Sequence, residues 1–117
     1  MLSFAGGMKV MLAVEPCDMR KGFNGLAGLV SQELGQEVRS GILFVFSNRT
    51  RTRLKRLFWD GSGLWVCSKR LEKGRFSWPK TLEEGQKRVE LRPEALAMLT
   101  DGIDLRGAKM RPWYERP

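Results

Sequence analysis

The sequence predicts the α+β fold class, with a small antiparallel β-sheet of about 4–6 strands built around a central meander. One long N-terminal helix is expected to pack on this sheet, and a short C-terminal helix to complete the domain. Three observations carry this prediction. Apolar residues recur at helical spacing between residues 23 and 34, and a continuous apolar run follows from Ile42 to Phe46. Asp60-Gly61, between two segments rich in β-formers, is typical of a hairpin turn.

The length of 117 residues is sufficient for one domain with one modest core. We expect a single α+β domain over residues 1–104 and a loosely ordered C-terminal tail over residues 105–117, where Gly, Pro and alternating charge gather. No run is long and apolar enough to cross a bilayer, and the first residues lack the features of a signal peptide. The expected location is therefore cytoplasmic, without membrane contact.

The first third of the chain predicts a strand followed by the long helix. Met8 to Val14 is a short apolar run that Pro16 ends. Asp18 stands where a helix N-cap is expected, and Gly35 where the helix should end. Glycines at every third position from Gly22 to Gly28 lower helix propensity, which indicates close approach of the helix backbone to the sheet. The apolar stripe consists of Phe23, Leu26, Ala27, Val30 and Leu34.

The central third predicts the meander. Ile42 to Phe46 is expected to be a central strand because it is continuously apolar. A basic strand from about Arg51 to Trp59 and a returning strand from Leu64 to Leu71 flank the Asp60-Gly61 turn. Arg75 to Trp78 is expected to be a short last strand, because Pro79 follows it.

The last third carries weaker patterns. Val89 to Leu91 is consistent with a brief strand. Pro93 suits the first turn of a helix that runs through Leu99 and ends near Gly102. These segments supply the expected C-terminal helix and one further strand.

The net charge of +8 is confined to one region. Between Val38 and Arg75 there are ten basic and two acidic residues, whereas the other positions hold eleven of each. Scattered basic residues would indicate little beyond solubility. Their concentration in one segment favours a surface that binds a polyanion.

Two clusters of cations form this region. If a strand begins at Arg49, its alternate side chains through Lys55 point to one side and make a positive ridge. The Asp60-Gly61 turn then brings a second cluster beside the first, and a sheet that tolerates such repulsion is expected to meet a counter-charge. The alternative is that the cations only keep an edge strand soluble. The candidate nucleic-acid contacts are Arg49, Arg51, Arg53, Lys55, Arg56, Lys69, Arg70, Lys73 and Arg75.

Four aromatic residues accompany these cations. Trp59 and Trp65 are expected to belong to the core on the inner face of the sheet. Phe76 and Trp78 lie near the end of a short strand, where an aromatic ring can stack on a base or pack on a partner. We therefore predict that Phe76 and Trp78 make stacking or partner contacts.

Catalysis is poorly supported by the sequence. Without histidine there is no Ser-His or Cys-His pair, and Cys17 and Cys67 are expected to be buried free thiols. Asp18 and Asp60 have local duties as cap and turn former, which leaves Asp101 and Asp104 beside Gly102 as the alternative for a metal-dependent nuclease. We expect no enzyme activity, no catalytic residues, no metal and no cofactor.

Four stretches together resemble a known family. They are Asp18-Met-Arg-Lys-Gly-Phe-Asn-Gly-Leu26, Leu43-Phe-Val-Phe46, Lys55-Arg-Leu-Phe-Trp-Asp-Gly-Ser-Gly-Leu64 and Lys69-Arg-Leu-Glu-Lys-Gly-Arg-Phe-Ser-Trp-Pro79. In this order, the chain to about Arg106 resembles the TnpB accessory proteins, encoded by the second open reading frame of bacterial insertion-sequence family sixty-six. These are distinct from the RNA-guided nucleases that carry the same letters.

The resemblance implies a protein encoded beside a separate transposase and needed for efficient movement of the element. It implies no catalytic residues to carry over. With the charge map, it predicts a non-catalytic accessory protein that binds DNA, at element ends or target sites, through a basic β-sheet surface. It would help to assemble the transposition complex with the transposase and the other accessory protein. The alternative is an adaptor that docks on the transposase without touching DNA. The oligomeric state is left open by the sequence.

Overall fold

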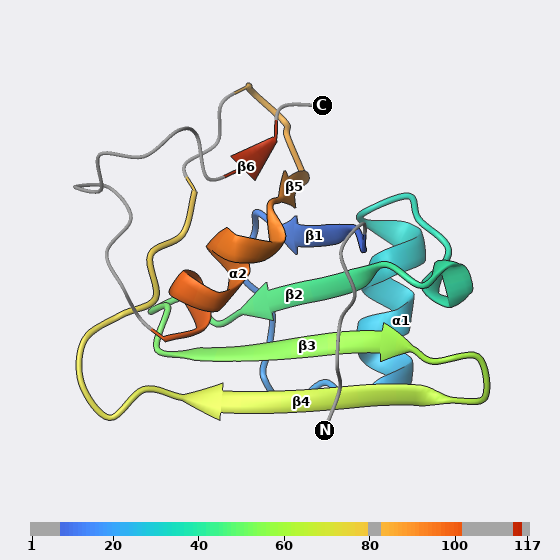
Figure 1. The fold of residues 1–117 in the computed structure, drawn as a ribbon, viewed down its shortest axis with the longest axis horizontal. Coiled ribbons are helices and arrows are strands. Elements are labelled where there is room, and N and C mark those ends of the chain that lie inside the picture. The colour runs from blue at the N-terminus through green and yellow to red at the C-terminus, as the bar shows by residue number, and fades with distance from the viewer. Residues whose placement is uncertain (1–7, 80–82, 102–113, 116–117) are drawn as a thin grey trace.

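The fold is one mixed β-sheet with a helix on each face, as a computed structural model that describes residues 8–79, 83–101 and 114–115 reveals (Figure 1). The sheet has six strands in the order β4-β3-β2-β1-β5-β6. In chain order the elements are β1 (Val10–Ala13), α1 (Phe23–Gln32), the short 3-10 turn η1 (Val38–Ser40), β2 (Leu43–Ser47), β3 (Arg53–Trp59), β4 (Leu64–Arg70), β5 (Arg88–Leu91), α2 (Pro93–Thr100) and β6 (Tyr114–Glu115).

The predicted fold class is wrong in two respects. The sheet is mixed rather than antiparallel, because β1 and β2 run parallel and α1 forms the crossover between them. The N-terminal helix is also not long, since it has only ten residues. The antiparallel part that the sequence predicted is confirmed at β2-β3-β4, a meander, and β5 adds antiparallel to the other side of β1.

The core lies on both faces of the central strands. All residues of β1 and β2 are buried, as expected for strands covered by a helix on either side. Strand side chains that point to one face of the sheet, such as Val10 and Leu12, form a core cluster with Leu96 and Leu99 of α2. Strand side chains that point to the other face, such as Met11 and Phe44, form a second cluster with Leu26 and Val30 of α1.

The start of α1 differs from its prediction. The N-cap is Gly22, without a side-chain hydrogen bond, and not Asp18. The Asp18 carboxylate instead accepts from the backbone N–H of Arg20 at 2.8 Å and pairs with its guanidinium at 2.7 Å. The expected close approach at the glycines is absent as well. A Cβ at Gly22 or Gly28 would meet nothing within 4 Å, and one at Gly25 would meet Lys21 rather than the sheet.

Segment 75–78 is not a strand, contrary to prediction, although it is tied to the sheet. The backbone N–H of Phe76 donates to the carbonyl of Arg51 at 2.6 Å, which holds this segment against the turn before β3. Of the predicted tail, residues 105–113, 116 and 117 lie outside the described residues, and Tyr114–Glu115 pairs with β5. No helix in the described part of the chain has the length and apolar character needed to span a membrane.

Candidate nucleic-acid interface

The basic segment forms the β3–β4 hairpin at one edge of the sheet (Figure 1). Asp60 closes the turn, because its carboxylate accepts from the backbone N–H groups of Ser62 at 2.8 Å and Gly63 at 2.9 Å. The indole Nε1–H of Trp65 donates to the same carboxylate at 2.7 Å. These hydrogen bonds hold the pKa of Asp60 well below its usual range, so the carboxylate that closes the turn stays ionised in mildly acidic solution as well.

The strand register brings cations together across the hairpin. Arg53 lies directly opposite Arg70, and Leu54 opposite Lys69. Side chains directly opposite each other lie on the same face of a sheet, so Arg53 and Arg70 share one face. Lys55 and Ser68 form the next pair on that face.

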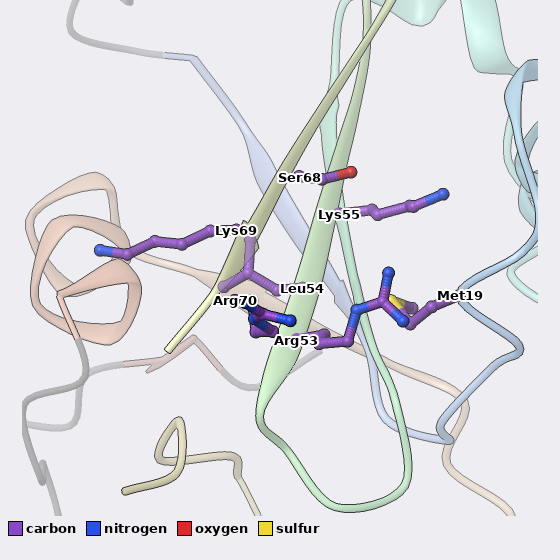
Figure 2. Close-up of a pocket in the computed structure, with 7 residues that line it drawn as sticks. All are labelled: Met19, Arg53, Leu54, Lys55, Ser68, Lys69 and Arg70. Atoms are coloured by element: carbon purple, nitrogen blue, oxygen red, sulfur yellow. The ribbon is translucent and has the colours of Figure 1, made fainter. Parts of the chain in front are cut away.

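A pocket of about 420 Å³ lies at this end of the hairpin (Figure 2). Lys55 and Ser68 point to the side on which Arg53 reaches toward Met19, whereas Lys69 extends away from it. Among the described residues that line the pocket none is acidic, so no carboxylate of theirs offsets its positive potential. The basic pocket is lined by Met19, Arg53, Leu54, Lys55, Ser68, Lys69 and Arg70.

The cations of the basic pocket differ in freedom. Arg53 and Arg70 are exposed. Lys55 is half-buried, and its Nζ donates to the backbone carbonyl of Lys21 at 2.7 Å. Lys55 thus fixes the segment before α1 against β3. Its ammonium group also contributes a positive charge to the pocket wall, in an orientation set by this hydrogen bond.

Two candidate cations lie on the opposite, α2 side of the hairpin. A guanidinium N–H of half-buried Arg56 donates to the hydroxyl of Thr100, and burial lowers the pKa of Arg56. Lys69 is exposed and lies 3.9 Å from the carboxylate of Asp101 at the end of α2. Strand alternation explains this split, since residues one position apart point to opposite faces.

Arg51 is occupied within the protein. Its guanidinium donates to the carbonyl of Val14 at 3.0 Å and to the hydroxyl of Ser47 at 3.1 Å. It also stacks on the ring of Trp78, 4.9 Å from the ring centre, and Trp78 in turn donates to the carbonyl of Ala13 at 3.0 Å. The backbone of Arg51 has a φ of 59°, in the left-handed region. The predicted ridge from Arg49 to Lys55 is therefore wrong, because β3 begins only at Arg53.

The remaining candidate cations are exposed beside the hairpin. Arg49 lies in the turn that precedes β3, and Lys73 and Arg75 lie in the segment that follows β4. Together with the hairpin they leave six exposed candidate cations: Arg49, Arg53, Lys69, Arg70, Lys73 and Arg75.

The aromatic residues are arranged differently from the prediction. Phe76 is a core residue with 3% exposure, and half-buried Trp78 is covered by Arg51. Trp65, expected in the core, is 46% exposed because β4 is the edge strand. Trp59 is half-buried beneath the guanidinium of Arg39. No pattern in the sequence distinguishes Trp65 from Trp59, because the exposure of Trp65 depends on the place of β4 in the sheet.

The chemistry of metal sites and thiols adds little to the interface. Within residues 8–79, 83–101 and 114–115, no group of three or more metal-ligating side chains converges. Asp101 lies beside Lys69, and Asp104 lies outside the described residues. Cys17 is half-buried, with a pKa raised by burial, whereas Cys67 is exposed on β4, contrary to the expected buried thiol.

Comparisons with known proteins identify the family. The sequence profile of the family described as IS66 Orf2 like protein matches residues 8–110. The uncharacterized protein y4jC of Sinorhizobium fredii is 35% identical over 117 residues, which covers all of this chain and 97% of that protein. The uncharacterized protein y4hO of the same organism is 39% identical over 106 residues, 91% of this chain and 90% of that protein. No solved structure matches. The chain therefore belongs to the IS66 Orf2 like protein family.

Proposed function

We propose that this protein is a non-catalytic accessory factor of insertion-sequence transposition that binds the phosphate backbone of DNA at the β3–β4 hairpin. The family connects the chain with an insertion sequence. The observation that carries DNA binding is the basic pocket, in which Arg53 lies opposite Arg70 and none of the described lining residues is acidic. Two like charges in register destabilise a sheet, and a bound phosphate relieves that repulsion.

The geometry favours contact with phosphates over reading of bases. The six exposed candidate cations lie at or beyond the end of the hairpin away from the Asp60 turn, with Arg53 and Arg70 on one face of the strands and Lys69 on the other. Arginine contacts to phosphate give affinity and orientation but no direct sequence discrimination. Arg51 and Arg56 support the hairpin through bonds within the protein, and Lys55 is held at Lys21. The proposed DNA is an element end or a target site, and the proposed protein partners are the transposase and the other accessory protein.

The test compares DNA affinity of three variants by fluorescence anisotropy. Arg53→Ala with Arg70→Ala should weaken binding to a duplex by about 10–100-fold, because two charge-assisted contacts are lost. Lys69→Ala should weaken it less, since one contact is lost. The control is Lys87→Ala, which removes an exposed charge that lies near Glu15 and Glu33 instead. Equal affinity of the double variant and the control would contradict the proposal.

A second candidate function is a protein adaptor that docks on the transposase without touching DNA. The observation in its favour is Trp65, whose large ring is 46% exposed at the turn end of the hairpin. Exposed tryptophan is typical of contact points in protein interfaces. This function predicts capture of the transposase that nuclease leaves unchanged and Trp65→Ala abolishes, together with no DNA binding by the purified chain.

A further inference from the structure

β4 presents an open sheet edge. It is the first strand in the sheet order, and among the described residues no strand lies on its outer side. It runs for seven residues, and five of them are exposed. Such an edge is a template for another strand unless it is covered or blocked.

The register shows which backbone groups face outward. The N–H of Asp60 donates to the carbonyl of Gly63, and the N–H of Leu71 to the carbonyl of Thr52. Hydrogen-bonded pairs alternate along an antiparallel ladder, so between these two ends Trp65, Cys67 and Lys69 bond to β3. The outward backbone groups are therefore those of Leu64, Val66, Ser68 and Arg70.

We propose that β4 pairs antiparallel with β4 of a second copy of this chain, about a two-fold axis at Cys67. This register uses all seven residues of the strand. It sets Val66 opposite the second copy's Ser68, and Leu64 opposite its Arg70, so every outward backbone group meets a partner. Cys67 lies opposite Cys67 of the second copy in a non-hydrogen-bonded pair, in which the two Cα atoms are about 4.5 Å apart.

The distribution of charge along β4 is compatible with β4 of a second copy as the partner strand. Its two cations, Lys69 and Arg70, are both at the C-terminal end, and the other five residues are uncharged. In the proposed register Lys69 meets the exposed Trp65 of the second copy, and Arg70 meets its Leu64. No cation lies opposite a cation, in contrast to the Arg53–Arg70 pair within one chain. Lysine over a tryptophan face is a favourable contact.

The dimer would place two basic pockets on one surface. Residues of equal parity pair in this register, so the face that carries Arg53 and Arg70 continues across the axis. The two Arg70 residues are six positions apart along the shared edge, about 20 Å at 3.4 Å per residue. This inference concerns self-association and stands whether or not DNA binds.

The first experiment measures the mass of the full chain, free of nucleic acid, by analytical ultracentrifugation. Added salt screens the repulsion between two chains of charge +8. We expect a dimer, and Ser68→Pro should weaken it about 10–100-fold because proline removes an outward N–H twice per interface. The control Ser68→Ala changes the same residue but keeps the outward N–H, so it should leave the dimer unchanged. A monomer, or a dimer that Ser68→Pro leaves unchanged, would overturn the proposal.

The second experiment tests the register by mild oxidation and does not depend on the proline variant. Wild type and Cys17→Ser should form a disulfide-linked dimer, and Cys67→Ser should not. In the Cys67→Ser background, Trp65→Cys combined with Lys69→Cys should restore the link, while either change alone should not. Links from the single variants, or none from the double variant, would contradict this register. A dimer that forms none of these links would show that the two chains associate through another surface or that β4 pairs with another strand. Either result would overturn the proposed pairing of β4 with β4.

Discussion

Arg51 and Arg53 are two residues apart in the sequence but have different tasks. Arg53 is exposed at the mouth of the basic pocket. Arg51 is turned inward by its left-handed backbone and joins the end of β1, the end of β2 and Trp78. An arginine held by two hydrogen bonds and a ring has little freedom left for a phosphate. The same residue type therefore supports the fold at one position and is proposed to bind DNA at the other.

Loss of the Arg51 contacts should lower stability. Arg51→Ala removes two hydrogen bonds and the Trp78 stack, so the free energy of unfolding should fall by about 1–3 kcal/mol. The matched control is Arg49→Ala, an exposed arginine of the same turn, for which a change within about 0.5 kcal/mol is expected. Urea denaturation measures both. Equal stability of the two variants would show that the Arg51 contacts contribute nothing.

Asp18 gives a pH-dependent signal that belongs to a single residue pair. Hydrogen bonds from Arg20 lower the pKa of Asp18 from 3.8 to about 2. Because the folded pKa lies below the unfolded one, the pair stabilises the fold above the unfolded value, and this contribution is lost as pH falls through about 2. In Arg20→Ala the NMR titration of the Asp18 carboxyl carbon should move back toward 3.8. An unchanged midpoint would exclude the Arg20 guanidinium as the main cause, since the backbone N–H of residue 20 remains in this variant.

At the scale of elements, local sequence patterns predicted where the strands and turns lie along the chain better than they predicted which strands pair. Strand β2 and the hairpin around Asp60 were placed within a residue or two, because apolar runs and turn residues act locally. The parallel pairing of β1 with β2 could not be read from them, since it depends on where α1 crosses the sheet. The N-cap predicted at Asp18 is wrong, because an Asp carboxylate can equally accept from the backbone N–H two residues on in a turn.

The glycines of α1 lead to a prediction at this scale. Gly28 lies within the helix, and a Cβ there would meet nothing within 4 Å. Gly28→Ala should therefore raise the free energy of unfolding by about 0.5–1 kcal/mol, through the better helix propensity of alanine. Gly25→Ala is the matched control, because its Cβ would lie 3.0 Å from the Lys21 Cβ and should cancel the gain. Urea denaturation that ranks Gly25→Ala above Gly28→Ala would contradict this explanation.

At the scale of the whole molecule, the fold collects charge that the sequence only brings into one segment. The excess of eight positive charges lies between Val38 and Arg75, and hairpin pairing concentrates part of it at one corner of the sheet. Which cations remain free could not be predicted, because Arg51, Lys55 and Arg56 are held by residues distant in the sequence. The exposure of Trp65 likewise could not be predicted, because it depends on β4 having β3 as its only neighbour among the described strands.

The salt dependence of DNA binding by the wild-type chain tests the central claim most directly. Each phosphate contact releases counterions, so six engaged cations should give a slope of about −5 when the logarithm of the association constant is plotted against the logarithm of salt concentration. Anisotropy titrations of one duplex over a range of salt give this slope. With Arg53→Ala and Arg70→Ala combined, it should become shallower by about 2. A slope near zero, or no binding at low salt, would contradict the proposal that the β3–β4 hairpin binds DNA.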